Sequence, residues 1–221
     1  MRFENIYEDV SVLRPEDYQA LERAIQTADA VDRCEIAALL AGFVQPQSMA
    51  LLLSLGRDED PVVRAEAYDS LAAFPFPEAE TFLRNSAETE RDALARAYAI
   101  LSLADVMLVQ QADLPACRGV FLKLLVRETD AQCRLSLHRA LCLFEAEDSL
   151  PPLLAFLRED NYQLRCAAVT AARDVLTVEN REPITRAIRS LLQSETTRAV
   201  LSRVEAVWGD LTEDGETQCG N

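Results

Sequence analysis

Residues 60–71 read Asp-Pro-Val-Val-Arg-Ala-Glu-Ala-Tyr-Asp-Ser-Leu, and this stretch decides the fold. Asp60 can cap the free amide groups at a helix start, and Pro61 suits the first turn, where its missing N–H costs nothing. Apolar residues then recur three or four positions apart, at Val63, Ala67, Leu71 and Phe74. This spacing predicts a capped amphipathic helix with one buried stripe.

The same pattern returns along the chain. Residues 130–141 and 161–172 repeat it closely, and weaker copies start at Asp32, Glu90 and Ser194. A more apolar helix is expected before each copy, and all six begin at or next to a proline: Pro15–Ala28, Pro46–Leu55, Pro77–Ser86, Pro115–Arg127, Pro151–Arg158 and Pro183–Gln193. One such pair cannot bury its apolar face alone, so neighbouring pairs must stack. We expect an all-α fold, a right-handed α-solenoid (α-α superhelix) of about six antiparallel helix pairs.

The repeats are predicted to form one domain over residues 1–208. Their approximate bounds are 15–43, 46–74, 77–109, 115–144, 151–176 and 183–208. Residues 209–221 are polar and acidic, which predicts a disordered tail. The starts at Glu90 and Asp130 lie farther apart than the others, which predicts a long helix to about Val109 and then a loop near 110–114. This loop could act as a recognition element.

The Asp-x-x-Val-Arg-x-x-Ala-x-x-x-Leu spacing resembles the HEAT repeat, and the short units are similar to those of the phycobilisome-lyase-type repeat family. The resemblance covers roughly residues 30–208. It implies a hydrogen-bonded ladder between repeats, which by position comprises Asp60, Arg64, Asp130, Arg134, Asn161 and Arg165 and could extend to Arg198. Leu94 stands where the third copy should carry Arg, so we expect the ladder to be interrupted there.

The composition favours a cytoplasmic, bacterial-type protein that does not contact a membrane. No apolar run is long enough to span a bilayer, and the start MRFENIYEDV carries acids where a signal peptide needs a basic and then an apolar run. Of the six cysteines, four lie inside apolar helical stretches and none forms a CxxC pair. We interpret them as small buried hydrophobes in a reducing compartment.

Catalytic and cofactor motifs are sparse. His138, the single histidine, has Cys142 one helical turn on and Cys133 nearby, which supplies at most part of a metal site. Both cysteines occupy helix-interior positions, without the strained turn or helix N-terminus that activates a nucleophile. We therefore expect no catalytic residue, no metal and no cofactor. A HEAT-like enzyme, either chromophore-lyase-like or a DNA-repair glycosylase, is the alternative.

The charge favours a basic protein as the partner. The chain carries 37 acidic and 22 basic residues, a net charge of −15, and residues 1–100 hold much of the excess. Nucleic-acid binding needs clustered basic residues, so we expect no nucleic-acid partner. The alternative is a charge that only keeps the protein soluble.

Side chains at equivalent positions of a solenoid line up in rows along its concave surface. The position after the central small residue gives Tyr68, Tyr98 and His138, and Glu66, Asp69 and Glu90 lie beside them. These six residues are the predicted partner-binding site of a non-catalytic protein–protein interaction scaffold or adaptor. Two alternatives stay open: the rings pack between repeats, or the protein is an immunity or inhibitor protein for a toxin.

Overall fold

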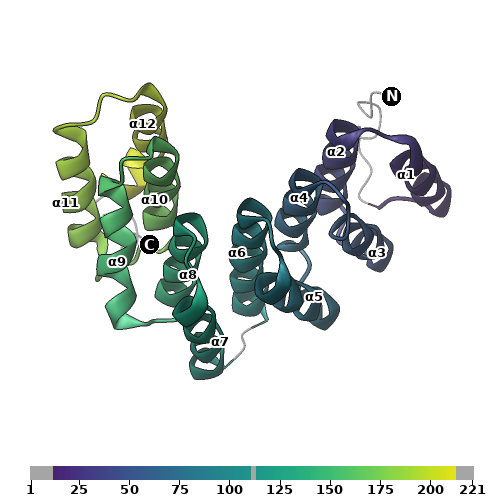
Figure 1. The fold of residues 1–221 in the computed structure, drawn as a ribbon, viewed down its shortest axis with the longest axis horizontal. Coiled ribbons are helices and arrows are strands. Elements are labelled where there is room, and N and C mark those ends of the chain that lie inside the picture. Colours follow the sequence, from purple (N-terminus) through teal and green to yellow (C-terminus); the bar gives the residue numbers. More distant parts are fainter. Residues whose placement is uncertain (1–11, 111–112, 213–221) are drawn as a thin grey trace, which may run out of the picture. The chain divides into compact units, whose positions relative to one another are not determined.

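The computed structural model describes residues 12–110 and 113–212, and the regular elements in these ranges are all helical (Figure 1). The chain divides into two compact units, unit 1 over residues 1–112 and unit 2 over 113–221. Unit 1 contains α1 (Pro15–Thr27), α2 (Ala30–Ala41), α3 (Pro46–Leu55), α4 (Pro61–Leu71), α5 (Pro77–Thr89) and α6 (Ala93–Val109). Unit 2 contains α7 (Leu114–Arg127), α8 (Ala131–Leu143), α9 (Leu150–Ala155), α10 (Tyr162–Asp174), α11 (Arg181–Leu192) and α12 (Arg198–Thr212), with the short 3-10 helices η2 (Glu147–Ser149) and η3 (Phe156–Arg158) flanking α9.

Each unit is a two-layer stack of three helix pairs. In unit 1, every odd-numbered helix packs against the even-numbered helix that follows it, and α2, α4 and α6 lie side by side in one layer. In unit 2, α8, α10 and α12 form the corresponding layer, with α7, α9 and α11 outside it (Figure 1). The predicted all-α repeat fold is confirmed for the described residues, because this stacking is how helix pairs bury faces that none can bury alone.

The helices α2, α4, α6, α8 and α10 begin at side-chain caps. Asp60, Asp130 and Asn161 accept hydrogen bonds from amides of the first turn, as predicted. The predicted starts at Asp32 and Glu90 are wrong. The caps there are Asp29, which accepts from Asp32 N at 2.9 Å, and Asp92, which accepts from Ala95 N at 3.0 Å. Ser194 also precedes its helix by several residues, because α12 begins at Arg198.

In five of the described helices, the arginine four residues after the cap donates hydrogen bonds to backbone carbonyls just before its own helix. These arginines are Arg33, Arg64, Arg96, Arg134 and Arg165. Arg64 Nη1 donates to the carbonyls of Asp58 at 2.9 Å and Glu59 at 3.0 Å. Arg96 makes the matching pair of bonds to the carbonyls of Glu90 and Arg91, so the third copy carries its arginine two residues after Leu94. The predicted interruption of the ladder at this copy stays a prediction.

Three of these arginines also reach the next repeat of their own unit. Arg64 Nε donates to Glu90 at 2.7 Å, Arg165 Nε to Glu195 at 2.7 Å, and Arg33 Nε lies 2.9 Å from Asp58. The acid stands two residues before the next cap in every case.

The predicted ladder is therefore right in its arginines Arg64 and Arg165 and wrong in its acids. Asp60, Asp130 and Asn161 hold only their own helix starts in the bonds described above, because a capping oxygen already faces the amides of its own first turn. Arg198 lies exposed at the start of α12 and makes no ladder contact with the described residues.

The ladder acids are strongly stabilised as anions. Burial alone would raise the pKa of Glu90, but hydrogen bonds from Arg64, from Asp92 N and from Tyr68 lower it to about 2. The hydrogen bond from Arg165 lowers the pKa of Glu195 to about 2 as well, against the opposing effect of burial. Each pair is a bidentate, nearly buried bridge that fixes one repeat on the next.

The end of unit 2 corrects the predicted tail. α12 continues past Gly209 to Thr212, because Leu211 is buried and its carbonyl accepts from Thr185 Oγ1 at 3.3 Å. Residues 209–212 thus belong to the helix, and the rest of the predicted tail, 213–221, lies outside the described residues. The long helix to Val109 is confirmed in α6, while residues 111–112 of the predicted loop also lie outside.

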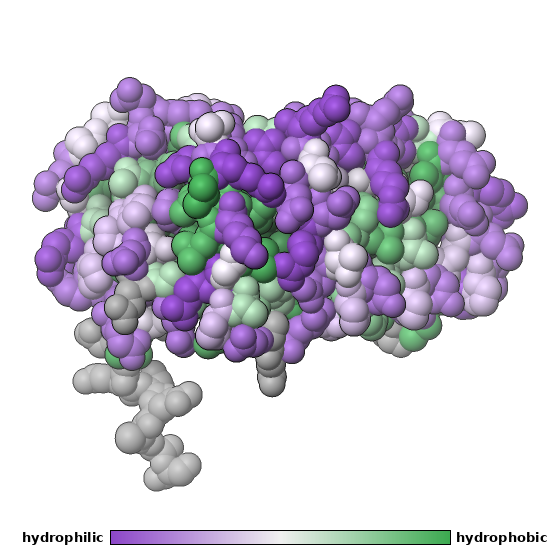
Figure 2. All heavy atoms as spheres, turned by 60° about the horizontal axis from the view of Figure 1, so that its bottom comes forward, coloured by the Kyte–Doolittle hydropathy of each residue, from purple (hydrophilic) through white to green (hydrophobic). Residues whose placement is uncertain are grey.

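The surface seen in Figure 2 is mostly hydrophilic, and hydrophobic residues form separate patches on it. Within the described ranges, no helix combines the length and apolar character that crossing a membrane requires.

Candidate protein-binding face

The exposed side of α2, α4 and α6 presents three rows of side chains in register. Counted from the caps Asp29, Asp60 and Asp92, the first row lies two positions on, the second six and the third nine. This spacing keeps the rows on one side of each helix. The rows are Val31, Val62 and Leu94; Glu35, Glu66 and Tyr98; and Ala38, Asp69 and Leu101. We call these nine residues, all exposed or half-buried, the even-helix face.

The first row is an exposed apolar strip. The exposed fractions are 67% for Val31, 54% for Val62 and 39% for Leu94. Single exposed apolar residues are normal on a protein surface, but here the same position is apolar on three adjacent helices. The first row therefore supplies apolar surface on each of the three helices, beside the acidic second and third rows.

The acids Glu66 and Asp69 have no cation to balance them. Neither side chain makes a hydrogen bond or an ion pair with the described residues. Partial burial, followed by the charge of Asp69, raises the pKa of Glu66. Desolvation of the Asp69 carboxylate by the protein around it raises the pKa of Asp69, and the negative charge of Asp105 raises it further. A raised carboxyl pKa means that the anion is less stable here than in water, so a bound cation would be stabilising.

The negative potential extends to both neighbouring helices. Burial raises the pKa of Tyr98 on α6, and Asp69 and Glu66 raise it further. Burial and then Glu66 also raise the pKa of the Cys34 thiol on α2. The acids of α4 therefore act on side chains across the whole face, and Tyr98 stands beside them half-buried, with no hydrogen bond from its hydroxyl to the described residues.

Three of the six predicted site residues lie on this face, namely Glu66, Asp69 and Tyr98. Tyr68 and Glu90 do not. Tyr68 is 2% exposed, and its hydroxyl donates to Gly56 O at 3.0 Å and to Glu90 Oε2 at 3.2 Å. Glu90 is a ladder acid, so its carboxylate is already occupied by Arg64. Burial thus excludes these two from a surface role.

His138 in unit 2 is also buried, with 6% of its surface exposed and its ring packed near Phe156. Burial, followed by the charge of Arg134, lowers its pKa, so the ring is neutral at physiological pH. The prediction that His138 contacts a partner is wrong for the same reason as for Tyr68: both stand eight positions after their caps, where the helix faces the core.

Tyr98 is placed on the surface by the structure, but the sequence alignment gives it the wrong counterparts in the other repeats. A repeat counted from Glu90 aligns Tyr98 with Tyr68, whereas counting from the observed cap Asp92 aligns Tyr98 with Glu66 and Glu35. The residue of α6 that corresponds to Tyr68 is Ile100, which is 1% exposed. Counting from Asp29 and Asp92 would also have revealed the missed members of the face, Glu35 and the apolar strip.

No candidate metal-binding site is found among the described residues. They contain no group of three or more His, Cys, Asp or Glu side chains positioned to hold one. The five cysteines in these ranges are free thiols, and burial raises the pKa of Cys142 to about 11.

Residues 18–104, less than half of the chain, match the family model HEAT_2, described as HEAT repeats. No curated protein matches the chain in sequence. The finer resemblance to phycobilisome-lyase-type repeats stays a prediction. HEAT repeats commonly serve as protein-interaction scaffolds, and the matched region contains the whole even-helix face. Unit 1 is thus similar to HEAT repeats both in its sequence and in its stacked helix pairs.

Proposed function

We propose that this protein is a non-catalytic interaction scaffold of the cytosol and that the even-helix face binds a basic segment of a partner protein. One observation carries the proposal. Glu66 and Asp69 are acids with raised pKa values that pair with no cation among the described residues, and they lie in register with an exposed apolar strip. A lysine- or arginine-rich segment would satisfy both features at once.

The two features suit the two parts of a basic side chain. The aliphatic stem of Lys or Arg can cover apolar surface while its charged head reaches a carboxylate. Stems lying on Val31, Val62 and Leu94 would bring heads toward the second and third rows, where Glu66 and Asp69 stand. Tyr98 adds an aromatic face and a free hydroxyl, both of which favour a bound cation.

Other observations support a scaffold. The matched HEAT repeats belong to a class of fold that commonly binds proteins, and the free thiols of the described residues are those expected in a reducing compartment.

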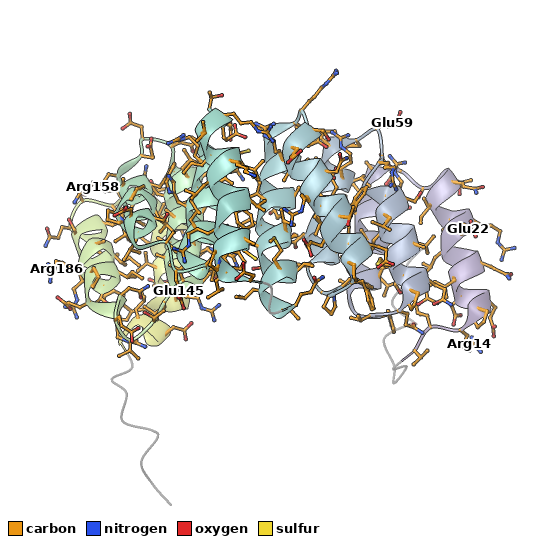
Figure 3. The ribbon with its side chains drawn as sticks, turned by 90° about the horizontal axis from the view of Figure 1, so that it is seen from below. Arg14, Glu22, Glu59, Glu145, Arg158 and Arg186 are labelled. Carbon is orange, nitrogen blue, oxygen red and sulfur yellow. The ribbon has the colours of Figure 1, made fainter. Side chains whose placement is uncertain are left out.

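The proposal is tested by affinity capture with the full chain as bait. The double variant Glu66→Gln/Asp69→Asn removes the two unbalanced charges, and Glu22→Gln/Glu59→Gln removes two exposed charges of unit 1 outside the face. Glu22 and Glu59 are labelled in Figure 3, at the periphery of the unit. We expect wild type and the control to capture the same basic proteins at low salt and to release them at high salt, whereas E66Q/D69N captures far less.

Two outcomes would contradict the proposal. One is equal capture by E66Q/D69N and by the control, which would mean that the face does not take part. The other is a captured set with no excess of basic proteins. A captured partner also allows a second check. Because a bound cation lowers the raised pKa values of Glu66 and Asp69, affinity should fall as the pH drops through those values.

A further inference from the structure

Unit 2 contains a cavity of about 660 Å³ at the junction of α9, η3, α11 and the loop before α12. Its lining includes apolar side chains from the outer helices and, at one end, the Arg165–Glu195 pair of the ladder. The apolar members are Leu154, Leu157, Ala187 and Leu191. The even-helix face lies in unit 1, so this cavity is a separate feature of the molecule.

Unit 1 contains the equivalent junction, between α3 and α5, and the caps align the two. Thr197 stands at the start of α12 as Asp92 stands at the start of α6, because its carbonyl accepts hydrogen bonds from Val200 N and Leu201 N. Glu195 lies two residues before Thr197, as Glu90 lies two residues before Asp92. Counting back from these caps, Ala187 takes the place of Phe82. Counting back from Asp60 and Asn161, Arg158 takes the place of Arg57.

In unit 1 an aromatic ring fills this junction. The guanidinium carbon of Arg57 lies 4.6 Å from the centroid of the Phe82 ring, and the Tyr68 ring lies 5.9 Å from it. Gly56 leaves room for the ring, since a Cβ there would stand 2.6 Å from Phe82 Cε1. Two smaller cavities, of about 440 and 380 Å³, flank Phe82, and the ring lines both.

In unit 2 the ring is missing, and the cavity of about 660 Å³ lies at the corresponding place. Ala187 stands for Phe82 and Val169 for Tyr68, so neither aromatic side chain is present. Leu157 and Leu191 stand for Gly56 and Ser86, and polar residues such as Ser190, Ser194 and Thr197 also line the cavity. Leu157 takes up part of the room, yet the cavity still exceeds either of those beside Phe82.

The arginine that covers the ring in unit 1 is retained and is free in unit 2. Arg158 lines the cavity, is exposed, and makes no hydrogen bond or ion pair with the described residues. Figure 3 shows it at the periphery of unit 2. Arginine over an aromatic face is a favourable cation–π arrangement. The molecule therefore contains one occupied and one vacant copy of the same site.

We propose that the cavity of unit 2 binds an aromatic side chain presented by a peptide segment of a partner protein, with Arg158 over the face of the ring. The ring takes the place that Phe82 takes in unit 1 and contacts Ala187, Leu157 and Leu191. This site does not depend on the basic segment proposed for the even-helix face, and its experiment uses other variants and other probes.

The experiment follows backbone amide resonances of the full ¹⁵N-labelled chain during titration with N-acetyl-phenylalaninamide. We expect saturable shifts at Ala187, Ser190 and Leu191 with millimolar affinity, the range open to a probe of this size. N-acetyl-leucinamide should bind more weakly. The capped peptide Ala-Ala-Phe-Ala-Ala should bind at least as tightly as the single residue, because the proposed ligand is a ring attached to a chain.

Arg158→Gln should weaken binding by about two- to fivefold through loss of the cation–π contact. Its matched control is Arg186→Gln, which removes an exposed arginine of α11 that pairs with Glu182 outside the cavity lining, and it should bind like wild type. Ala187→Phe should abolish binding by filling the cavity from within. Because Ala187→Phe could disturb folding, its amide spectrum must first match that of wild type. If the spectra differ, the comparison of R158Q with R186Q tests the proposal instead.

Four results would overturn the proposal: no saturable shift at these amides, equal binding of the phenylalanine and leucine probes, equal affinities of R158Q and R186Q, or weaker binding of the peptide than of the single residue.

Discussion

Replacing Glu90 by Gln should destabilise the protein strongly and in a pH-dependent way. The Glu90 carboxylate is 7% exposed and accepts four hydrogen bonds, from Arg64 Nε at 2.7 Å, Arg64 Nη2 at 2.9 Å, Asp92 N at 2.9 Å and Tyr68 Oη at 3.2 Å. Glutamine keeps the shape and one acceptor oxygen, but it removes the charge and turns an amide NH2 toward Arg64.

The magnitude follows from the carboxyl pKa. A fall from 4.5 to about 2 on folding corresponds to about 3 kcal/mol of stabilisation above pH 5, at 1.36 kcal/mol per pKa unit. Solvent reaches Arg64, whose side chain is 17% exposed, so we expect a measured loss of about 2 kcal/mol for E90Q at pH 7. The folded pKa is the lower one. The contribution is therefore lost as the pH falls from the unfolded value toward the folded one, and less than half of it remains at pH 3.

The assay is urea unfolding followed by circular dichroism at pH 7 and at pH 3, for wild type, E90Q and Glu59→Gln. Glu59 is the matched control, because its exposed side chain precedes a cap in the same unit and only its backbone carbonyl contacts Arg64. E59Q should stay within about 0.5 kcal/mol of wild type. The stabilising role of the Glu90 anion is contradicted if E90Q costs no more than E59Q at pH 7, or if the cost of E90Q is the same at both pH values.

Three further outcomes are expected. Gly56→Ala should lower the free energy of unfolding in urea by about 1–3 kcal/mol, because its Cβ would stand 2.6 Å from the Phe82 ring. Gly119→Ala in α7, whose Cβ would meet no neighbouring side chain within 4 Å, should raise the free energy of unfolding by up to about 1 kcal/mol. Asp92→Ala should cost about 1 kcal/mol and Asp92→Asn only a few tenths, since Asn also caps; equal losses would show that Asp92 is not the cap. Burial raises the pKa of the Cys142 thiol from 9.0 to about 11, so the thiol should react with iodoacetamide at pH 8 about 100-fold more slowly in the folded protein than in urea. Mass spectrometry measures both rates, and similar rates would contradict the burial of this thiol.

Periodicity and capping chemistry were enough to predict the helix pairs. The odd-numbered helices begin at or near prolines, and α2, α4, α6, α8 and α10 begin at Asp or Asn, so local residues set most boundaries to within a few positions. The prediction failed where two acids compete for one helix start. Asp29 and Asp32 are equally plausible caps in sequence, and the choice depends on which oxygen meets the first-turn amides. For the third copy, Asp92 is the better cap by residue type alone, because Asp is a preferred N-cap and Glu is not.

The candidate site depended on that choice. Because the sequence alignment of the first and third copies is off by two or three residues, it includes Glu66, Asp69 and Tyr98 of the even-helix face but omits Val31, Val62, Leu94 and Glu35. A shift of two residues turns a helix position through more than half a turn, so it exchanges core-facing and solvent-facing side chains. This is why Tyr68 is buried although Tyr98 is half-exposed.

The sequence by itself determined the all-helical repeat, its period, and the recurrence of Arg64, Arg134 and Arg165, because these depend on residues within a few positions of the chain. Only the tertiary structure decided which acid each arginine binds, which rows face solvent, and that the place of Phe82 is vacant beside Ala187. Those outcomes depend on how one repeat packs on the next. Helix packing brings together residues about thirty positions apart, and their local sequence carries no mark of that contact.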